Sequence, residues 1–322
     1  MDNLIGKVLH VEAFDLLAQL PNESVNLVFC DPPYNIGVFS KMPHNKYMSW
    51  CERWIAEAAR VLTKNGAFWI VHKNPGVLVD LSRVVEKCGR GRINWITWDK
   101  YNGNPTIQAQ GGPMLGLTMM KNLLSFQVMA EYLVWHSSNA FFGDEIRVAR
   151  KKVGLTTVEL NESFKSNPKT INHGGRVSNW EHGCNIPSEK EFFKLVELLN
   201  LDCNLENLQE EYRKRRCVFN NPGSVSSVWQ IPPASRNGHA TPKPELLLER
   251  IIDNTSNSGD IILDFFAGSF TTAAVAERLD RRWICGDCDK RWAELGNNRL
   301  DKVKQTLLPM NFEDRTNVPV RS

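Results

Sequence analysis

The sequence contains no apolar run that approaches the roughly 20 residues needed for a transmembrane helix. Its first residues, MDNLIGKVLHVEAFD, have no basic segment followed by a continuous apolar one, so no secretory signal peptide is expected. Basic and acidic residues nearly balance, and the net charge of +3 is too small to indicate a nucleic-acid partner by itself. These absences exclude an integral membrane protein and predict a cytoplasmic one.

The sequence also lacks internal repeats and low-complexity tracts, which excludes a solenoid and a disordered chain. Its eight cysteines are scattered, and several lie inside apolar runs, as is typical of reduced thiols in the cytosol. Cys285 and Cys288 have C-x-x-C spacing, but no second cysteine pair or histidine pair lies nearby. We therefore expect no metal site.

What the sequence does contain is an alternation of strand-like and helix-like segments. The run from Tyr47 to Leu62 has a helical apolar period, Gly66 is expected to end that helix, and AFWIVH follows as a strand. Such alternation predicts an α/β fold with a doubly wound, mainly parallel sheet. We assign this domain to residues 1–140 and 217–322, interrupted by a small helical insert at 141–216.

The segment FCDPPYNIG, from Phe29 to Gly37, ends an apolar run that is typical of a buried strand. Prolines cannot continue a sheet ladder, so the residues that follow the run are expected on a stiff loop at the strand end. Open α/β sheets bind their ligands at that end of their strands. The candidate catalytic residues are Asp31, Pro32, Pro33 and Tyr34.

A second motif, LDFFAGSFTTAAVAERL, runs from Leu263 to Leu279 and has the form strand, small-residue turn, helix. Such a turn lets a ligand approach backbone amides at a helix N-terminus. No lysine follows as in a phosphate-binding loop. About 20 residues further on, the next predicted strand ends in Asp287, where an acid can bind ribose hydroxyls. Alone, the motif is equally consistent with a structural turn and a surface acid.

Together the two motifs resemble those of the DNA amino-methyltransferases that modify N6 of adenine or N4 of cytosine. DPPYN is similar to the catalytic motif of that superfamily and LDFFAGSFTT to its cofactor motif, while HATPKPELLLERII resembles the segment preceding the latter. The catalytic motif comes first, which is the permuted order of the beta class. The resemblance covers roughly residues 5–135 and 217–303. It implies a Rossmann-like methyltransferase fold and S-adenosyl-L-methionine as cofactor.

The resemblance also implies a set of cofactor-binding residues. They are Glu12, Thr241, Lys243, Asp264, Phe266, Ala267, Gly268, Ser269 and Asp287. Phe270 departs from the family pattern, which has a second glycine at this place. Its side chain either crowds the cofactor or packs into a hydrophobic seam between helix and sheet, and we expect the seam.

The chemistry of amino methylation accounts for the DPPY tetrapeptide. An ionised carboxylate only accepts hydrogen bonds, so Asp31 can take one N–H of the target amino group and the Pro32 carbonyl the other. This arrangement aims the nitrogen at the methyl donor by positioning and electrostatics. Tyr34 offers a stacking face to a base that has left the duplex, worth roughly 1–3 kcal/mol. In the superfamily that the sequence resembles, a serine at this position is more usual for cytosine N4, so the resemblance with Asp31 favours adenine N6.

The insert has a resemblance of its own, to helix-turn-helix domains of phage repressors. IRVARKKVGLTTVEL and VSNWEHGCNIPSEKEFFKLVELL are similar to that domain, with KSNPKTINHGG lengthening the turn. Such proteins place a recognition helix in the major groove. The candidate DNA contacts are Arg147, Arg150, Lys151, Lys152, Asn172, His173, Arg176 and Asn179. A helical decoration with solvated basic faces is the alternative.

The sequence therefore predicts a site-specific DNA methyltransferase that moves a methyl group from S-adenosyl-L-methionine to N6 of a flipped-out adenine in double-stranded DNA. A cytosine-N4 enzyme is the alternative within the same class. A DNA-binding regulator on a degenerate methyltransferase shell is the alternative from another class. RNA is a weaker candidate substrate, because its deep, narrow major groove does not admit a recognition helix. A homodimer and a restriction endonuclease partner both stay open.

Overall fold

The computed structural model describes residues 1–35, 42–100, 130–137, 139–165, 175–183, 185–220, 226–235 and 242–307. The first half contains β1 (Val8–His10), α1 (Ala13–Ala18), β2 (Val25–Cys30), α2 (His44–Val61), β3 (Leu62–His72), α3 (Pro75–Lys87), β4 (Arg92–Asp99) and β5 (Ala130–Ser137). A helical segment follows, with α6 (Asn139–Lys152), α7 (Thr157–Glu162), α8 (Gly175–Glu181), α9 (Glu189–Leu199), the 3₁₀ turn η1 (Leu205–Asn207) and α10 (Leu208–Arg215). The chain then forms β6 (Val228–Gln230), α11 (Glu245–Thr255), β7 (Ile261–Asp264), α12 (Thr271–Arg278), β8 (Arg282–Asp287) and α13 (Lys290–Leu307).

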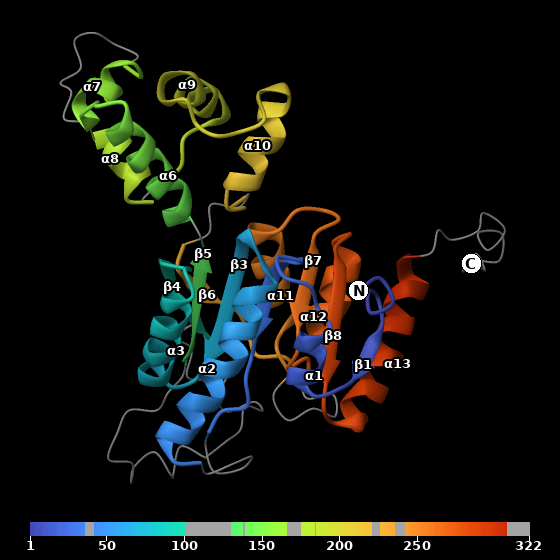
Figure 1. Cartoon of the computed structure of the whole chain (residues 1–322). Helices are drawn as coiled ribbons and strands as arrows, with labels where there is room; N and C mark the ends of the chain where they lie inside the picture. Colours follow the sequence, from blue (N-terminus) through green and yellow to red (C-terminus); the bar gives the residue numbers. More distant parts are fainter. Residues whose placement is uncertain are drawn as a thin grey trace, which may run out of the picture.

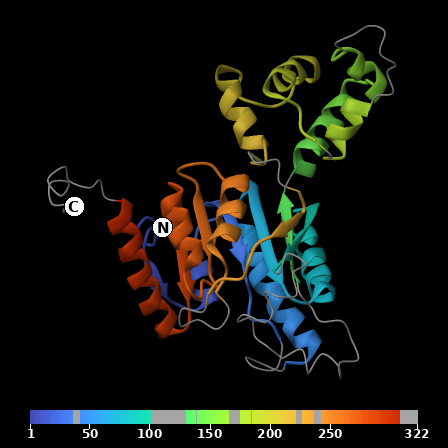
Figure 2. The ribbon, with the colours of Figure 1, turned by 180° about the vertical axis from the view of Figure 1, so that it is seen from behind.

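These strands build one sheet of eight, in the order β1-β8-β7-β2-β3-β5-β4-β6. Only β5 runs antiparallel to its neighbours; the other pairings are parallel. Helices α1, α2 and α3 cover one face and α11, α12 and α13 the other (Figures 1 and 2). The predicted doubly wound, mainly parallel sheet is confirmed. Within the described ranges, no helix is long and apolar enough to cross a membrane.

The central strands are apolar on both faces, because each face has its own hydrophobic layer. In β2, Val28 and Cys30 pack with the layer of α1–α3, whereas Leu27 and Phe29 pack with that of α11–α13. Alternate residues of a strand point to opposite faces, so a strand buried twice reads as a continuous apolar run. This run delivers Asp31 to a fixed place at the end of β2.

One predicted boundary is wrong. Helix α2 ends at Val61, and the chain passes directly into β3, so Gly66 does not end a helix. Gly66 lies inside β3, where an added Cβ would meet the Leu62 side chain at 2.5 Å and the Asn26 carbonyl oxygen at 2.9 Å. The glycine is required by close packing of two strands rather than by a helix terminus.

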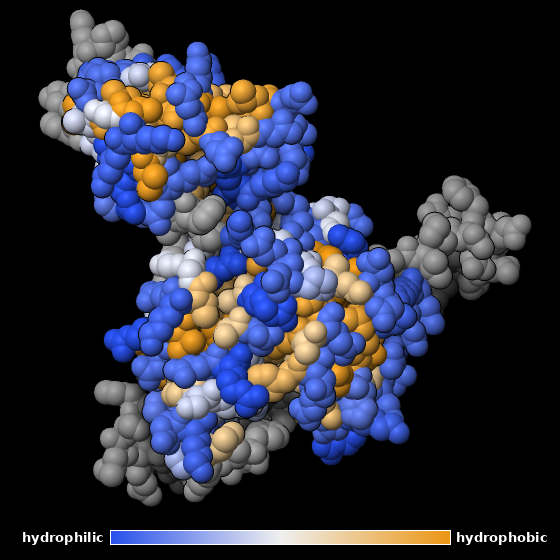
Figure 3. Space-filling view, viewed as in Figure 1, coloured by the Kyte–Doolittle hydropathy of each residue, from blue (hydrophilic) through white to orange (hydrophobic). Residues whose placement is uncertain are grey.

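Helices α6–α10 pack around a hydrophobic cluster of their own, which includes Phe142, Trp180 and Phe192. They form a separate lobe above the sheet (Figures 1 and 3). We call this segment, residues 141–216 with the start of α6, the insert. It meets the sheet where β3 begins: the Asn65 side chain donates to the backbone carbonyls of Arg213 and Arg216, at 3.0 and 3.3 Å.

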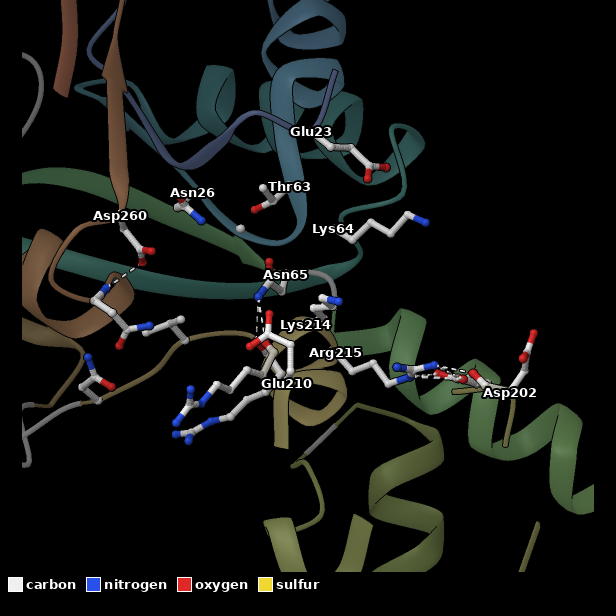
Figure 4. A pocket seen from close by; sticks show the side chains of 17 residues that line it. Glu23, Asn26, Thr63, Lys64, Asn65, Asp202, Glu210, Lys214, Arg215 and Asp260 are labelled. Atoms are coloured by element: carbon white, nitrogen blue, oxygen red, sulfur yellow. Dashed lines mark hydrogen bonds and ion pairs between the residues drawn. The ribbon is translucent and has the colours of Figure 1, made fainter. Parts of the chain in front are cut away.

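A cleft of about 1140 Å³ lies at this junction (Figure 4). Its wall includes Lys64 and Asn65 from β3 and Lys214 and Arg215 from α10. Arg215 points away from the sheet, and its guanidinium pairs with Glu145 at 3.0 Å (Figure 4). Five acidic and five basic side chains line the cleft, so it carries no strong charge of one sign.

Candidate active site

Acidic side chains from strands distant in sequence meet at one edge of the sheet. Asp264 and Asp287 are the last residues of β7 and β8. Asp31 directly follows β2, and Glu12 lies just after β1, at the N-cap position of α1. These strands are parallel neighbours, so their carboxyl ends lie together. We call this the carboxyl edge. The structure thus brings the predicted catalytic and cofactor segments to one place.

The loop after β2 is held by hydrogen bonds from both sides. The Tyr34 hydroxyl donates to Asp31 Oδ1 at 3.0 Å, and the Tyr47 hydroxyl of α2 donates to the Pro33 carbonyl at 3.2 Å. Pro32 is buried, whereas Pro33 is exposed. The Tyr34 ring lies against the ring of His72 at the end of β3, with centroids 4.4 Å apart. The tetrapeptide is therefore a rigid platform with an oriented carboxylate.

Lys243 lies beside this platform rather than against the 264–269 turn. Its ammonium is 2.5 Å from Asp31 Oδ2 and 3.7 Å from Oε2 of Glu131 in β5. Burial by itself would lower the pKa of Lys243, but the two carboxylates outweigh burial and raise it. Lys243 is consequently a permanent cation next to Asp31.

Glu131 joins the same network from the opposite side. Its Oε1 pairs with Lys100, which follows β4. Its Oε2 accepts from the Tyr34 hydroxyl at 3.4 Å. Burial would raise the pKa of Glu131, but Lys243 and Lys100 outweigh it, so the pKa lies below its usual value. Burial next to both carboxylates also raises the Tyr34 pKa far above its ordinary value, so the phenol stays a donor.

The turn after β7 is shaped by its acidic residues. Asp264 is buried; its Oδ1 accepts from the Phe266 amide at 3.0 Å and its Oδ2 from the Thr272 hydroxyl at 2.6 Å. Burial raises the pKa of Asp264 to about 7, although the Thr272 hydrogen bond opposes the shift. Asp264 thus braces the turn from behind.

Asp287 closes the same turn from β8. Its Oδ2 accepts from the Gly268 amide at 2.9 Å, while Gly268 adopts a φ of +49° that favours glycine. Ala267 and Ser269 are buried, and the Ser269 hydroxyl bonds to that of Thr271 at 3.0 Å. The turn is therefore rigid before any ligand arrives.

The remaining groups at this edge suit a nucleoside. Asp287 is half-buried, and each of its oxygens keeps a lone pair beyond the backbone amide that it accepts. Glu12 is exposed and makes no capping hydrogen bond to its helix. Phe266 is half-buried, with its ring 5.7 Å from that of Trp50. Carboxylates accept from ribose hydroxyls and an aromatic ring packs on a flat heterocycle, so this set fits S-adenosylmethionine.

The insert places its predicted DNA contacts unevenly. Arg150 contradicts the prediction, because it is buried and pairs with Glu181, with its Nε 2.5 Å from a carboxylate oxygen. Arg147 pairs with Asp144, and Arg176 with Glu191 at 3.1 Å.

Three other predicted contacts of the insert, Lys151, Lys152 and Asn179, are exposed. Thr241, Asn172 and His173 lie outside the described residues, as does the segment 101–121.

Sequence reasoning missed three residues of the site: Glu131, Lys100 and His72. A signal was present for Glu131, because it is a single acid within the apolar strand AEYLVWHS, where an ionised side chain needs a partner. Lys100 and His72 end strands at the same edge, but nothing local in the sequence relates them to Asp31.

The fold agrees with comparisons to known proteins. The M1.HpyAVI–SAM complex shares the fold, with a TM-score of 0.52 at 17% identity over 92% of this chain and 98% of that one. The type II methyltransferase M1.MboII of Moraxella bovis is 27% identical over 307 residues, 93% of this chain and 98% of its own. The DNA adenine methyltransferase YhdJ of Escherichia coli K12 is 28% identical over 300 residues, 91% of this chain and 82% of its own.

A family match spans most of the sequence. The N6_N4_Mtase family, described as DNA methylase, matches residues 25–298, which include both motifs and all strands except β1. The chain therefore belongs to the N6_N4_Mtase family of DNA methylases.

Proposed function

We propose that this DNA methylase transfers the methyl group of S-adenosylmethionine to N6 of an adenine flipped out of double-stranded DNA. The observation that carries the proposal is the Asp31 carboxylate, fixed by Tyr34 and Lys243 beside the 264–269 turn. β2 and β7 are adjacent and parallel, so the two motifs occupy neighbouring strand ends. An aspartate in this motif and the relative named as an adenine methyltransferase support adenine.

The residues act on the amino group without covalent chemistry. Asp31 accepts one N–H of the adenine amino group and the Pro32 carbonyl accepts the other, which orients the nitrogen lone pair toward the methyl donor. S-adenosylmethionine supplies an electrophilic methyl group on a sulfonium. Once the nitrogen is alkylated it carries a positive charge, and Asp31 is positioned to stabilise that charge and receive the proton.

The cofactor would be held by residues on both sides of the turn. Asp287 and Glu12 would accept from hydroxyl or amino groups, and Phe266 would contact the heterocycle. Asp264 would act through the turn, because both of its oxygens are already engaged and it is buried. Gly268, Ala267 and Ser269 shape the turn, and Thr241 stays in the proposed set.

Tyr34 would receive the flipped base, with the buried ring of His72 packed against it. Burial lowers the pKa of His72, so its ring is neutral and stacks without adding charge. A base outside the duplex loses its neighbours, and an aromatic face offsets part of that loss. Tyr34 would therefore stabilise the extruded base while its hydroxyl keeps Asp31 oriented.

We propose residues 1–140 and 217–322 as the methyltransferase domain and 141–216 as a DNA-binding insert of the helix-turn-helix type. Asn65, which contacts the insert, and His72, which contacts Tyr34, lie seven positions apart along β3. At about 3.3 Å per strand residue, this is about 23 Å. The insert would thus contact DNA beyond the target base pair, through Lys151, Lys152 and Asn179.

The test is nucleoside mass spectrometry of DNA incubated with the purified protein and cofactor. N6-methyladenine is expected, and it should vanish with Asp31→Asn, which keeps the side-chain shape but removes the charge. N4-methylcytosine would establish the alternative base. If the protein binds cofactor but forms neither product, a DNA-binding regulator on a degenerate methyltransferase shell is favoured.

A further inference from the structure

We propose that Glu131 and Lys243 are positioning residues for methyl transfer, which together keep Asp31 ionised and aim its free lone pairs at the target amino group. This inference rests on the proposed role of Asp31. It adds a carboxylate–lysine network, defined as Asp31, Lys243, Glu131 and Lys100, that reaches the loop after β2 from β4, β5 and the segment before α11.

The geometry ties the two carboxylates together twice. Lys243 Nζ lies 2.5 Å from Asp31 and 3.7 Å from Glu131, so one ammonium serves both. The Tyr34 hydroxyl lies 3.0 Å from Asp31 Oδ1 and 3.4 Å from Glu131 Oε2. The side chains of Lys243 and Glu131 are each only 9% exposed, so water screens this cluster poorly.

Two carboxylates this close cannot both stay ionised without a cation between them. In an unshielded pair, one group takes up a proton at a much higher pH than usual. A protonated Asp31 would offer a donor where the amino group needs an acceptor. Lys243 prevents this, and Lys100 balances the second charge, so the network contains two cations and two anions.

Glu131 has a second effect, on Lys243. An ammonium shared between two carboxylates withdraws less electron density from Asp31 than one paired with Asp31 alone. With a neutral residue in place of Glu131, Lys243 would pair with Asp31 alone. The Asp31 carboxylate would then accept hydrogen bonds from the substrate less strongly. Glu131 therefore acts on the reaction through Lys243, without touching the reacting atoms.

Other groups also face Asp31. Besides Lys243 and Glu131, they are Cys30, Tyr34, Tyr47, His72 and Asp264. None of these five is a cation at neutral pH, because thiols, phenols and carboxyl groups carry no positive charge and burial lowers the pKa of His72. Among the described residues around Asp31, Lys243 is thus the cation that holds it ionised.

The decisive experiment compares pH–rate profiles of single-turnover methylation between about pH 6.5 and 8.5. The wild type is the reference profile, because Asp264, with a pKa of about 7, contributes to every variant. Lys243→Met should show an additional acid limb, because Asp31 and Glu131 then share one proton without the ammonium between them. Adding Glu131→Gln should abolish the additional limb, because the second carboxylate of the network is gone.

Glu131→Gln alone keeps the shape and should lower kcat about tenfold, with cofactor Kd unchanged within about twofold. Since this change is isosteric, it tests the idea even if Lys243→Met does not fold. Lys290→Met, which breaks a surface pair with Glu294 on α13, is the matched control and should behave as wild type.

Specific outcomes would overturn the inference. They are a Lys243→Met profile that matches wild type, an additional limb that persists in the double variant, and a wild-type kcat for Glu131→Gln. Normal turnover by Asp31→Asn would instead sink the proposed function itself, so the two failures are distinguishable.

Discussion

The ring of Phe270 occupies the space that a side chain at Gly296 would need. A Cβ at position 296 would lie 2.6 Å from Cδ2 of Phe270, well inside van der Waals contact. Phe270 is fully buried and has a φ of 54°, a left-handed conformation that costs about 1–2 kcal/mol in an L-residue. The ring therefore points into the seam between α12 and α13, and the glycine of α13 compensates for the missing glycine of the turn.

This contact predicts that Gly296→Ala changes the free energy of unfolding in opposite directions in two backgrounds. In the wild type, Gly296→Ala should lower the free energy of unfolding by about 1–3 kcal/mol, because the methyl group overpacks the ring. With Phe270→Ala, the same substitution should raise it by up to about 1 kcal/mol, since alanine favours a helix over glycine. Urea unfolding of the four proteins measures the cycle, and equal effects in both backgrounds would refute the contact.

Asp264 predicts a pH dependence of stability. Its folded-state pKa of about 7 lies above the ordinary 3.8, so the native state binds the proton more tightly than the unfolded chain. The free energy of unfolding should therefore fall as pH rises from about 4 to 7, by about 1.4 kcal/mol per unit at most. Asp264→Asn should remove this slope. The free energy of unfolding of the variant relative to wild type should therefore be higher at pH 8 than at pH 5. Parallel urea-unfolding curves at both pH values would contradict the assignment.

The two parts of the Tyr34 side chain should separate in mutants. Tyr34→Ala removes the stacking face and should weaken capture of the extruded base by roughly 1–3 kcal/mol. Tyr34→Phe keeps the ring and should retain most of that capture. Fluorescence of 2-aminopurine at the target position reports extrusion directly. Equal fluorescence for the alanine variant and wild type would remove Tyr34 from base binding.

Arg150 should behave as a structural residue of the insert. Arg150→Met leaves Glu181 buried without its partner, which should cost about 3–5 kcal/mol in the stability of α6 and α8. Arg150→Met/Glu181→Met should recover much of this loss, because the unpaired charge is gone. Hydrogen exchange of the insert amides in the whole chain measures the effect. Exchange in Arg150→Met that matched wild type would return Arg150 to the set of phosphate contacts.

Lys151 and Lys152 should act on DNA affinity without changing the target. Replacing both with alanine should reduce the slope of log affinity against log salt by about 2. Since the insert lies at the end of β3 away from Tyr34, sequencing of methylated positions should give the same sites as wild type. Lys302→Ala, on the exposed side of α13, is the control. Altered sites would show that the insert reads the target sequence.

The strands and the catalytic edge follow from local signals. Continuous apolar runs ending in Asp31, Asp264 and Asp287 predict buried parallel strands, and parallel strands must bring their ends together. Gly66 misled the helix boundary because a glycine needed for close strand packing looks, in sequence, like a helix terminus.

The contacts that cross the sheet could not be predicted in the same way. Lys243 meets Asp31 across 212 positions, and Glu131 meets Tyr34 across 97. Only the strand order, with β5 inserted antiparallel between β3 and β4, places Glu131 next to β3 and within reach of the loop after β2. Arg150 was misassigned for a related reason, since a basic run does not reveal which of its members faces a buried acid.

The insert leaves and rejoins the sheet at the end remote from Asp31: β5 ends at Ser137, and after Arg216 the chain returns along α11, where Asn220 bonds to the Asp253 and Ser256 carbonyls. Both connections of the insert are therefore separate from the catalytic edge. A different module with similarly spaced ends would break none of the hydrogen bonds described around Asp31. The catalytic edge and the insert can thus change independently of one another.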